Sequence, residues 1–182
     1  MKYAFCGGKI LSGQEDMVPL EGYTVLVDGE VIADIVPATE PVPEGYRRID
    51  LGGRYIMPGL INMHVHLAGN GKPQKKQRDN EKLVKTIMGS ALTRAVAYRM
   101  VGDFAKTELY SGVTTIRTVG GLGDFDTRLR DEIATGRKAG PRILAAGRGI
   151  SVPGGHMAGS VAVAAHNVDE ALRTLRYAKK KR

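Results

Sequence analysis

Along most of this chain, short apolar segments of strand length alternate with longer segments of helical periodicity. The strand-like segments are residues 56–67, 113–119 and 143–146. The helical segments are residues 81–110, a segment that Asp124 is expected to cap, and residues 168–179. Alternation of this kind predicts an α/β fold in which parallel strands are joined by crossover helices.

The helical segments also carry predicted boundaries and faces. Gly102-Asp103 is expected to divide residues 81–110 into two helices, with Asp103 capping the second. In the last helix, Leu172 and Leu175 are expected to face the interior. The apolar residues expected to share one buried face in the first stretch are Val84, Ile87, Met88, Ala91, Leu92, Ala95 and Val96.

The first 57 residues contain only short strand-like segments and turns. Residues 25–27 and 31–35 flank Asp28-Gly29, and this dipeptide predicts a hairpin with a type I′ turn, which requires positive φ angles. Residues 37–45 contain three prolines and predict a loop, and residues 47–51 predict another short strand. A small β unit is therefore expected before the α/β part.

The distribution of charge argues against nucleic-acid binding. The formal net charge is +8, but Lys72, Lys75, Lys76 and Arg78 form one basic run and residues 179–182 form another. The basic residues outside these runs equal the 19 acidic ones in number. Neither run interleaves the aromatic side chains that stack on bases, so we expect a solvated loop and a charged tail.

Composition excludes several other classes of protein. No apolar run approaches the roughly 18 residues needed to span a bilayer, and no signal-peptide core is recognisable. The single cysteine, Cys6, excludes a disulfide framework and is expected to be a small buried residue rather than a nucleophile. We expect a cytoplasmic protein with no membrane and no nucleic-acid partner.

The sharpest chemical feature is the pair His64 and His66 at the end of the first strand-like segment. Alternate residues of a strand point to one face, so the two imidazoles project together while Val65 points toward the helices. Two imidazoles at the carboxyl end of a parallel strand can hold one cation. The residues alone leave two interpretations equally open: a metal-binding pair, or a partly buried, hydrogen-bonded structural pair.

Several motifs follow one another in a fixed order along the chain. They are Pro-Gly-Leu-Ile-Asn-Met-His-Val-His-Leu at 58–67, Ser-Gly-Val-Thr-Thr-Ile-Arg at 111–117, Gly-Pro-Arg-Ile-Leu-Ala-Ala-Gly at 140–147, Ile150-Ser151 and Gly154-Gly155-His156. Together they resemble the amino-terminal portion of the amidohydrolase superfamily, in its imidazolonepropionase and prolidase-like branch. The resemblance implies that residues 1–57 are an incomplete small β-sandwich segment. It also implies that residues 58–182 are the first three βα units of a (β/α)₈ TIM barrel, which needs about 250 residues to close.

The resemblance further implies a metal-dependent hydrolase. Such an enzyme cleaves the C–N bond of an amide or cyclic amide, and a dipeptide-like or imidazolone-like small molecule is the expected substrate. His64 and His66 are the implied ligands of one or two divalent cations, with zinc expected, which would activate a water molecule and polarise the carbonyl. The remaining ligands and the catalytic proton-transfer residue are expected beyond Arg182.

His156 and Arg117 are the candidate substrate-binding residues, and each has an alternative interpretation. The His156 ring could instead satisfy backbone groups of its own glycine-rich loop, and Arg117, like Arg148, could be a surface arginine. Two positions depart from the family pattern: Thr118 and Asn62 stand where aspartate is frequent. Both departures concern hydrogen bonds that support metal ligands.

Two other functions compete with that of an active hydrolase. The chain could be a catalytically incompetent fragment that acts only through association, because three βα units leave an open sheet edge. Self-association or a homo-oligomer is expected for the same reason. The chain could also be a basic binding module, for which salt-sensitive binding of nucleic acid is expected.

Overall fold

The computed structural model describes residues 1–69 and 79–181. The predicted basic loop at residues 72–78 lies outside the described residues, as does Arg182 of the predicted charged tail. Within the described part of the chain, no helix has both the length and the apolar character that crossing a membrane requires.

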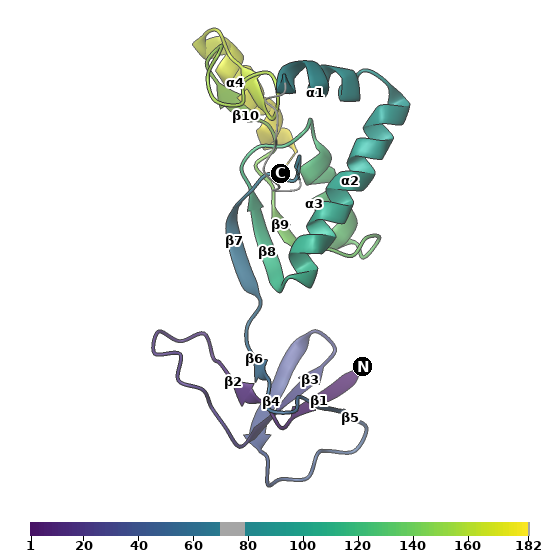
Figure 1. Cartoon of the computed structure of the whole chain (residues 1–182), viewed down its shortest axis with the longest axis vertical. Coiled ribbons are helices and arrows are strands. Elements are labelled where there is room, and N and C mark those ends of the chain that lie inside the picture. Colours follow the sequence, from purple (N-terminus) through teal and green to yellow (C-terminus); the bar gives the residue numbers. More distant parts are fainter. Residues whose placement is uncertain (70–78, 182) are drawn as a thin grey trace. The chain divides into compact units, whose positions relative to one another are not determined.

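The chain divides into two compact units, Met1–Pro58 and Gly59–Arg182. The regular elements of the first unit are strands (Figure 1). Four of them form a sheet in the order β4-β3-β1-β5, and β2 pairs with β6. Cys6 is buried in this unit beside Ala4 and Leu26, as predicted. The bounds are β1 Lys2–Cys6, β2 Lys9–Ile10, β3 Tyr23–Asp28, β4 Val31–Pro37, β5 Arg47–Asp50 and β6 Tyr55–Ile56.

The predicted hairpin is confirmed between β3 and β4, but its turn differs from the expectation. The strands pair antiparallel with Asp28 opposite Val31, which leaves Gly29 and Glu30 as a two-residue loop. Gly29 has a φ of 61°, whereas Glu30 does not have a positive φ. One positive φ, at the first central position, is typical of a type II′ turn and not of type I′.

The second unit is built on three parallel strands in the order β7-β8-β9. The strands are β7 Leu60–Val65, β8 Val113–Thr118 and β9 Arg142–Leu144. The helices are α1 Asn80–Met88, α2 Ala91–Tyr110, α3 Phe125–Ala134 and α4 Val168–Lys180. A separate parallel pair, β10 Gly149–Ser151 and β11 Ala162–Ala164, was not predicted. The predicted mixed α/β fold, with parallel strands and intervening helices, is confirmed.

One face of the three-stranded sheet packs against α2 and α3 (Figure 1). Val65, Ile116 and Ile143, one from each strand, share a core with Val101 of α2 and Leu129 of α3. Burying a side chain of this size contributes about 1.5–3 kcal/mol to folding. Val65 therefore faces the helices, as strand alternation predicts, and the histidines on either side of it face away from them.

β7 is an edge strand, and its first half is largely uncovered. Leu60, Ile61 and Met63 are 51%, 63% and 50% exposed. An uncovered apolar edge strand is a surface on which another strand can pair. Self-association of the chain stays a prediction, and this edge is where it is expected.

The break in the first helical stretch lies at Gly89 and Ser90, so the predicted break at Gly102-Asp103 is wrong. The Ser90 side chain accepts a hydrogen bond of 3.2 Å from the backbone N–H of Thr93 and thereby caps α2. Gly102 stays helical because the turn that contains it is buried. Packing of that turn outweighs the roughly 1 kcal/mol that glycine costs inside a helix.

The same break changes which side chains of this stretch face the core. Val84, Ile87 and Met88 of α1 pack against the core as predicted. Leu92 and Val96 of α2 are 75% and 55% exposed, so the prediction is wrong for them. Two helices separated by a break do not keep one rotational phase, and the single predicted face therefore ends with α1.

α4 is a helix as predicted, but its predicted inner face is wrong. Leu172 and Leu175 are 37% and 56% exposed, and no residue of α4 is fully buried. The side of α4 that faces the rest of the unit carries Thr174 and Ala178. Helical periodicity identifies an apolar stripe, but it does not say whether that stripe is the covered one.

Asp124 precedes α3, but its side chain makes no capping hydrogen bond there. Its carboxylate lies 3.5 Å from the Nζ atom of Lys181 instead. The expected helix cap is therefore replaced by a contact between the start of α3 and the end of α4.

A partly buried carboxylate stabilises the turn between α3 and β9. Glu132 accepts hydrogen bonds from the Tyr98 hydroxyl at 2.8 Å and from Arg128 Nε at 3.0 Å, and it lies 3.1 Å from Lys138 Nζ. Its side chain is only 13% exposed. Burial raises the pKa of this carboxyl, but the three hydrogen bonds together outweigh burial and lower the pKa to about 2.

We expect the stability of the chain to fall as the pH falls from about 4.5 to about 2. The folded-state pKa of Glu132 lies below the ordinary value of 4.5, so its contribution is complete above pH 4.5 and is lost as the folded carboxyl protonates. The lost free energy of unfolding should be on the order of 1 kcal/mol, because solvent screens a cluster of charges near the surface. Urea unfolding at several pH values measures it. Glu132→Gln should flatten the curve in this window, whereas Glu108→Gln should leave its slope unchanged; equal slopes in the wild type and Glu132→Gln would contradict the prediction.

Candidate metal centre

The structure brings His64 and His66 together at the carboxyl end of β7. Their ring centroids lie 5.2 Å apart, and the ring planes are inclined at 71°. His64 is exposed and His66 is partly buried, so the outer ring faces solvent while the inner one lies against the protein. Two imidazoles at this separation can direct one nitrogen each toward a common cation.

The His66 ring is oriented by a backbone carbonyl. Its Nδ1 atom lies 3.3 Å from the carbonyl oxygen of Gly120, at the end of β8. A carbonyl oxygen only accepts, so in the neutral ring Nδ1 carries the proton of this contact and Nε2 keeps the lone pair that a cation can use. Gly120 has a φ of 144°, and a Cβ there would come within 3.4 Å of the His66 ring. The positive φ therefore favours glycine at this contact.

Asn62, where the family frequently has aspartate, supports the strand end in a different way. Its Oδ1 atom accepts a hydrogen bond of 3.2 Å from the backbone N–H of His64. The Asn62 side chain is therefore engaged by the backbone of the histidine segment. Just before β7, a Cβ at Gly59 would overlap the side chain of Thr114. Glycine at this position therefore allows the start of β7 to pack closely against β8.

The donor set of this site fits a divalent cation in part. Two imidazole nitrogens are ligands that suit zinc and other borderline metals. A zinc ion ordinarily takes three or four protein ligands. Among residues 1–69 and 79–181, no cluster of three or more histidine, cysteine, aspartate or glutamate side chains could hold a metal. The ligand role of His64 and His66 stays a prediction, and at least one more ligand is needed.

The two candidate substrate-binding residues lie on other elements of the same unit. Arg117 is exposed on β8, next to the strand that carries the histidines. His156 is exposed in the loop between β10 and β11. No hydrogen bond or ion pair within the described part of the chain joins either residue to the histidine pair, and their substrate-binding roles stay predictions.

A buried polar network that the sequence did not reveal lies beneath these strand ends. Asp126, at the start of α3, is 2% exposed. Its Oδ2 atom accepts hydrogen bonds from the Thr118 hydroxyl at 2.7 Å and from the Gly147 N–H at 3.0 Å. Its Oδ1 atom accepts one of 2.8 Å from the Thr127 N–H. The Thr118 hydroxyl also accepts from the Ala146 N–H at 3.2 Å.

This network joins the end of β8, the start of α3 and the segment after β9. Thr118 is thereby explained: it stands where aspartate is frequent, and it donates its hydroxyl proton to the carboxylate of Asp126. One residue of the sequence, Gly121, is consistent with this network. Gly121 lies where a Cβ would approach the Asp126 carboxyl carbon to 3.1 Å, so the second glycine after β8 makes room for this side chain.

Residues 55–182 match the model of the amidohydrolase family. The chain belongs to this family. Members of the amidohydrolase family generally use divalent metals, which agrees with the donor set at the end of β7. The family match covers the whole α/β unit, including the histidine pair and the Asp126 network.

The proteins that the chain is similar to carry several names. A dihydroorotase of Staphylococcus aureus is 39% identical over 69 residues, which are 38% of this chain and 15% of that protein. An imidazolonepropionase of Klebsiella pneumoniae is 36% identical over 118 residues, which are 57% of this chain and 29% of that protein. A crystal structure from Bifidobacterium longum, provisionally named a prolidase, is 30% identical with a TM-score of 0.73, covering 99% of this chain and 38% of the other. This chain thus spans less than half the length of each.

Proposed function

We propose that this chain provides two metal ligands, His64 and His66, of a hydrolase that cleaves an amide or cyclic-amide C–N bond. The observation that carries the proposal is the pair of imidazole rings 5.2 Å apart at the end of β7. Enzyme sites in parallel α/β folds lie at the carboxyl ends of the strands. Membership of the amidohydrolase family supports a hydrolase in general.

The residues of this chain have distinct parts in such a reaction. His66 would hold the cation through Nε2, while its Nδ1–H donates to the Gly120 carbonyl oxygen and thereby restricts rotation of the ring. His64 approaches from the solvent side, and Asn62 holds its backbone. A bound divalent cation, for which we propose zinc, supplies a Lewis acid that lowers the pKa of water and polarises a carbonyl. Arg117, on the neighbouring strand, is proposed to pair with a substrate carboxylate.

The architecture proposed for the complete enzyme follows from the same site. The α/β unit then corresponds to the first three βα units of a (β/α)₈ barrel, and the β unit to part of a small β-sandwich. The parallel order β7-β8-β9 and the similarity over 99% of the chain to a solved structure support this proposal. Further ligands and the proton-transfer residue would come from other strands of the barrel.

The substrate class is proposed from the relatives. They are named imidazolonepropionase, dihydroorotase and prolidase. We therefore expect a small dipeptide-like or imidazolone-like molecule.

The test is hydrolysis of an alanyl-proline dipeptide and of imidazolonepropionate, with and without added Zn²⁺, by the complete enzyme proposed above, in which this chain is joined to the strands that supply the further ligands. Zinc-dependent turnover of one substrate, abolished by a chelator, is the expected result. Zinc binding without turnover of either would contradict the proposed activity. It would favour the other reading, a chain without catalytic activity that acts through association. The cytoplasmic location stays a prediction.

A further inference from the structure

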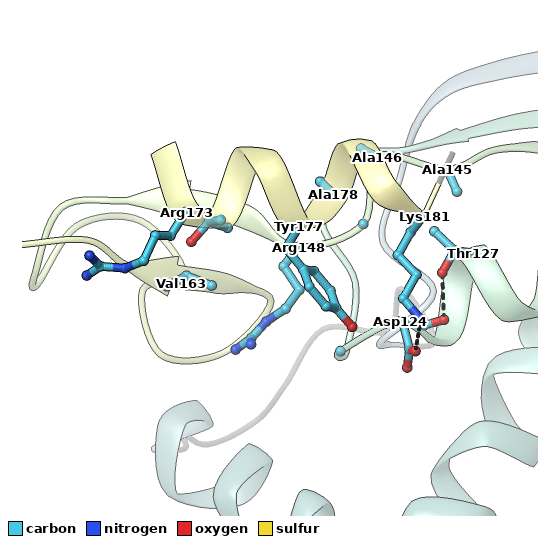
Figure 2. Close-up of a pocket in the computed structure, with 13 residues that line it drawn as sticks. Asp124, Thr127, Ala145, Ala146, Arg148, Val163, Arg173, Tyr177, Ala178 and Lys181 are labelled. Carbon is cyan, nitrogen blue, oxygen red and sulfur yellow. Dashed lines mark hydrogen bonds and ion pairs between the residues drawn. The ribbon is translucent and has the colours of Figure 1, made fainter. Parts of the chain in front are cut away.

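A cavity of about 310 Å³ lies between α4, the start of α3 and the segment after β9 (Figure 2). Neither His64 nor His66 lines it. Its size falls at the lower end of the range for small-molecule sites, roughly 300–1,000 Å³. Much of its wall consists of short apolar side chains, those of Ala145, Ala146, Val163 and Ala178.

The cavity exists because α4 presents small residues to the rest of the unit. Thr174 and Ala178 line it, whereas the longer Leu172 and Leu175 are exposed to solvent. Tyr177 is the one aromatic side chain in the lining, and it projects from α4 into the cavity (Figure 2). The result is an apolar space with an aromatic ring on one wall, which suits a flat apolar body.

The charged groups of the lining are mostly basic. Lys181 is already paired with Asp124 at 3.5 Å. Arg173 lies 3.9 Å from Glu170, and its guanidinium points away from Lys181 and Asp124 (Figure 2). Arg148 takes part in none of the ion pairs or side-chain hydrogen bonds among residues 1–69 and 79–181. One guanidinium in the lining is therefore left to receive an anion.

The backbone on both sides of Arg148 is anchored. Gly147 N–H donates to the buried Asp126 carboxylate at 3.0 Å, and Gly149 N–H donates to the Val161 carbonyl at 3.0 Å. Gly147 has a φ of 73°, which favours glycine at this position. Because the backbone is already held, little backbone freedom is lost when the arginine binds an anion.

We propose that this cavity binds a small aromatic carboxylate. Its ring lies against Tyr177 and the alanine walls, and its carboxylate pairs with the Arg148 guanidinium in the forked geometry that arginine favours. A monoanion is favoured over a phosphate dianion because, among residues 1–69 and 79–181, one guanidinium of the lining and not two lacks an ion pair. The proposed site does not include His64 or His66, so a test of binding there does not depend on the proposed hydrolase activity.

The test is titration of 2-naphthoate into the full chain, followed by isothermal calorimetry. Saturable binding with one molecule per chain is expected, and the neutral 2-naphthamide should bind about tenfold more weakly or worse because the charge-assisted bond is lost. Arg148→Gln should weaken 2-naphthoate binding by about the same factor. Arg48→Gln, which removes an exposed arginine of the first unit, should leave the affinity unchanged.

A second variant fills the space without removing charge. Ala178→Leu keeps a good helix former on α4 and should abolish binding, with circular dichroism confirming the helical content. Because Arg148 is exposed, Arg148→Gln decides the question even if Ala178→Leu fails to fold. Equal affinity of the wild type and Arg148→Gln, equal binding of the acid and the amide, or no binding at millimolar 2-naphthoate would each overturn the proposal.

Discussion

Replacing His64 or His66 with alanine should lower the affinity of the chain for Zn²⁺ by about tenfold or more. Each substitution removes one of the two imidazole nitrogens that lie at the end of β7, and even residues that only support a ligand change metal affinity by about 10–100-fold. His66→Ala should have the larger effect because its ring is already oriented by the Gly120 carbonyl. Isothermal titration of the full chain with Zn²⁺ measures both constants.

His166→Ala is the matched control for this experiment. His166 is an exposed histidine just before α4, and its backbone N–H donates a hydrogen bond of 2.9 Å to the Glu170 carboxylate. Its substitution removes one imidazole from the chain and should leave the zinc affinity within about twofold of wild type. A wild-type affinity in both His64→Ala and His66→Ala would show that the pair is structural, the other interpretation that the residues allow.

Asp126→Asn should destabilise the chain by about 2 kcal/mol. Three donors converge on this buried carboxylate, from Thr118, Gly147 and Thr127. An amide has one acceptor oxygen, so its NH₂ group must face at least one of those donors, and an unsatisfied buried donor costs about 1–3 kcal/mol. Urea unfolding measures the change, and faster amide exchange at Gly147 should localise it.

Asp131→Asn makes the same chemical change on the exposed side of α3. The Asp131 side chain is 59% exposed and pairs with Arg130, so the free energy of unfolding should change by no more than about 0.5 kcal/mol. If Asp126→Asn were as stable as Asp131→Asn, the Asp126 network would contribute nothing that water could not replace.

The arrangement of strands and helices could be predicted because it depends on local patterns. Parallel strands follow from the alternation of apolar runs with helical segments, and the hairpin follows from Asp28-Gly29. The break between α1 and α2 could not be predicted in the same way, because Ser90 and Gly102 are both plausible break points and burial decides between them. The prediction for the face of α4 failed for a related reason: Leu172 and Leu175 form a regular stripe, yet the structure covers the side that carries Thr174 and Ala178.

The same difference between local and long-range patterns applies to the candidate site. The two histidines are predictable because they are two residues apart on one strand. The partner of His66 is 54 residues away, and those of Asp126 are up to 21 residues away. No spacing rule connects residues at such separations, since they meet only when β7, β8 and β9 are placed side by side.

α4 has a further consequence for the behaviour of the unit. The helix has no fully buried residue, and at its C-terminal end Arg130 and Asp124 hold Lys181 through contacts of 2.9 Å and 3.5 Å. A helix attached in this way belongs to the parts of a protein that open before the core unfolds. The cavity beneath α4 exists only while the helix is closed, so any molecule bound there selects the closed state and slows the opening of the helix.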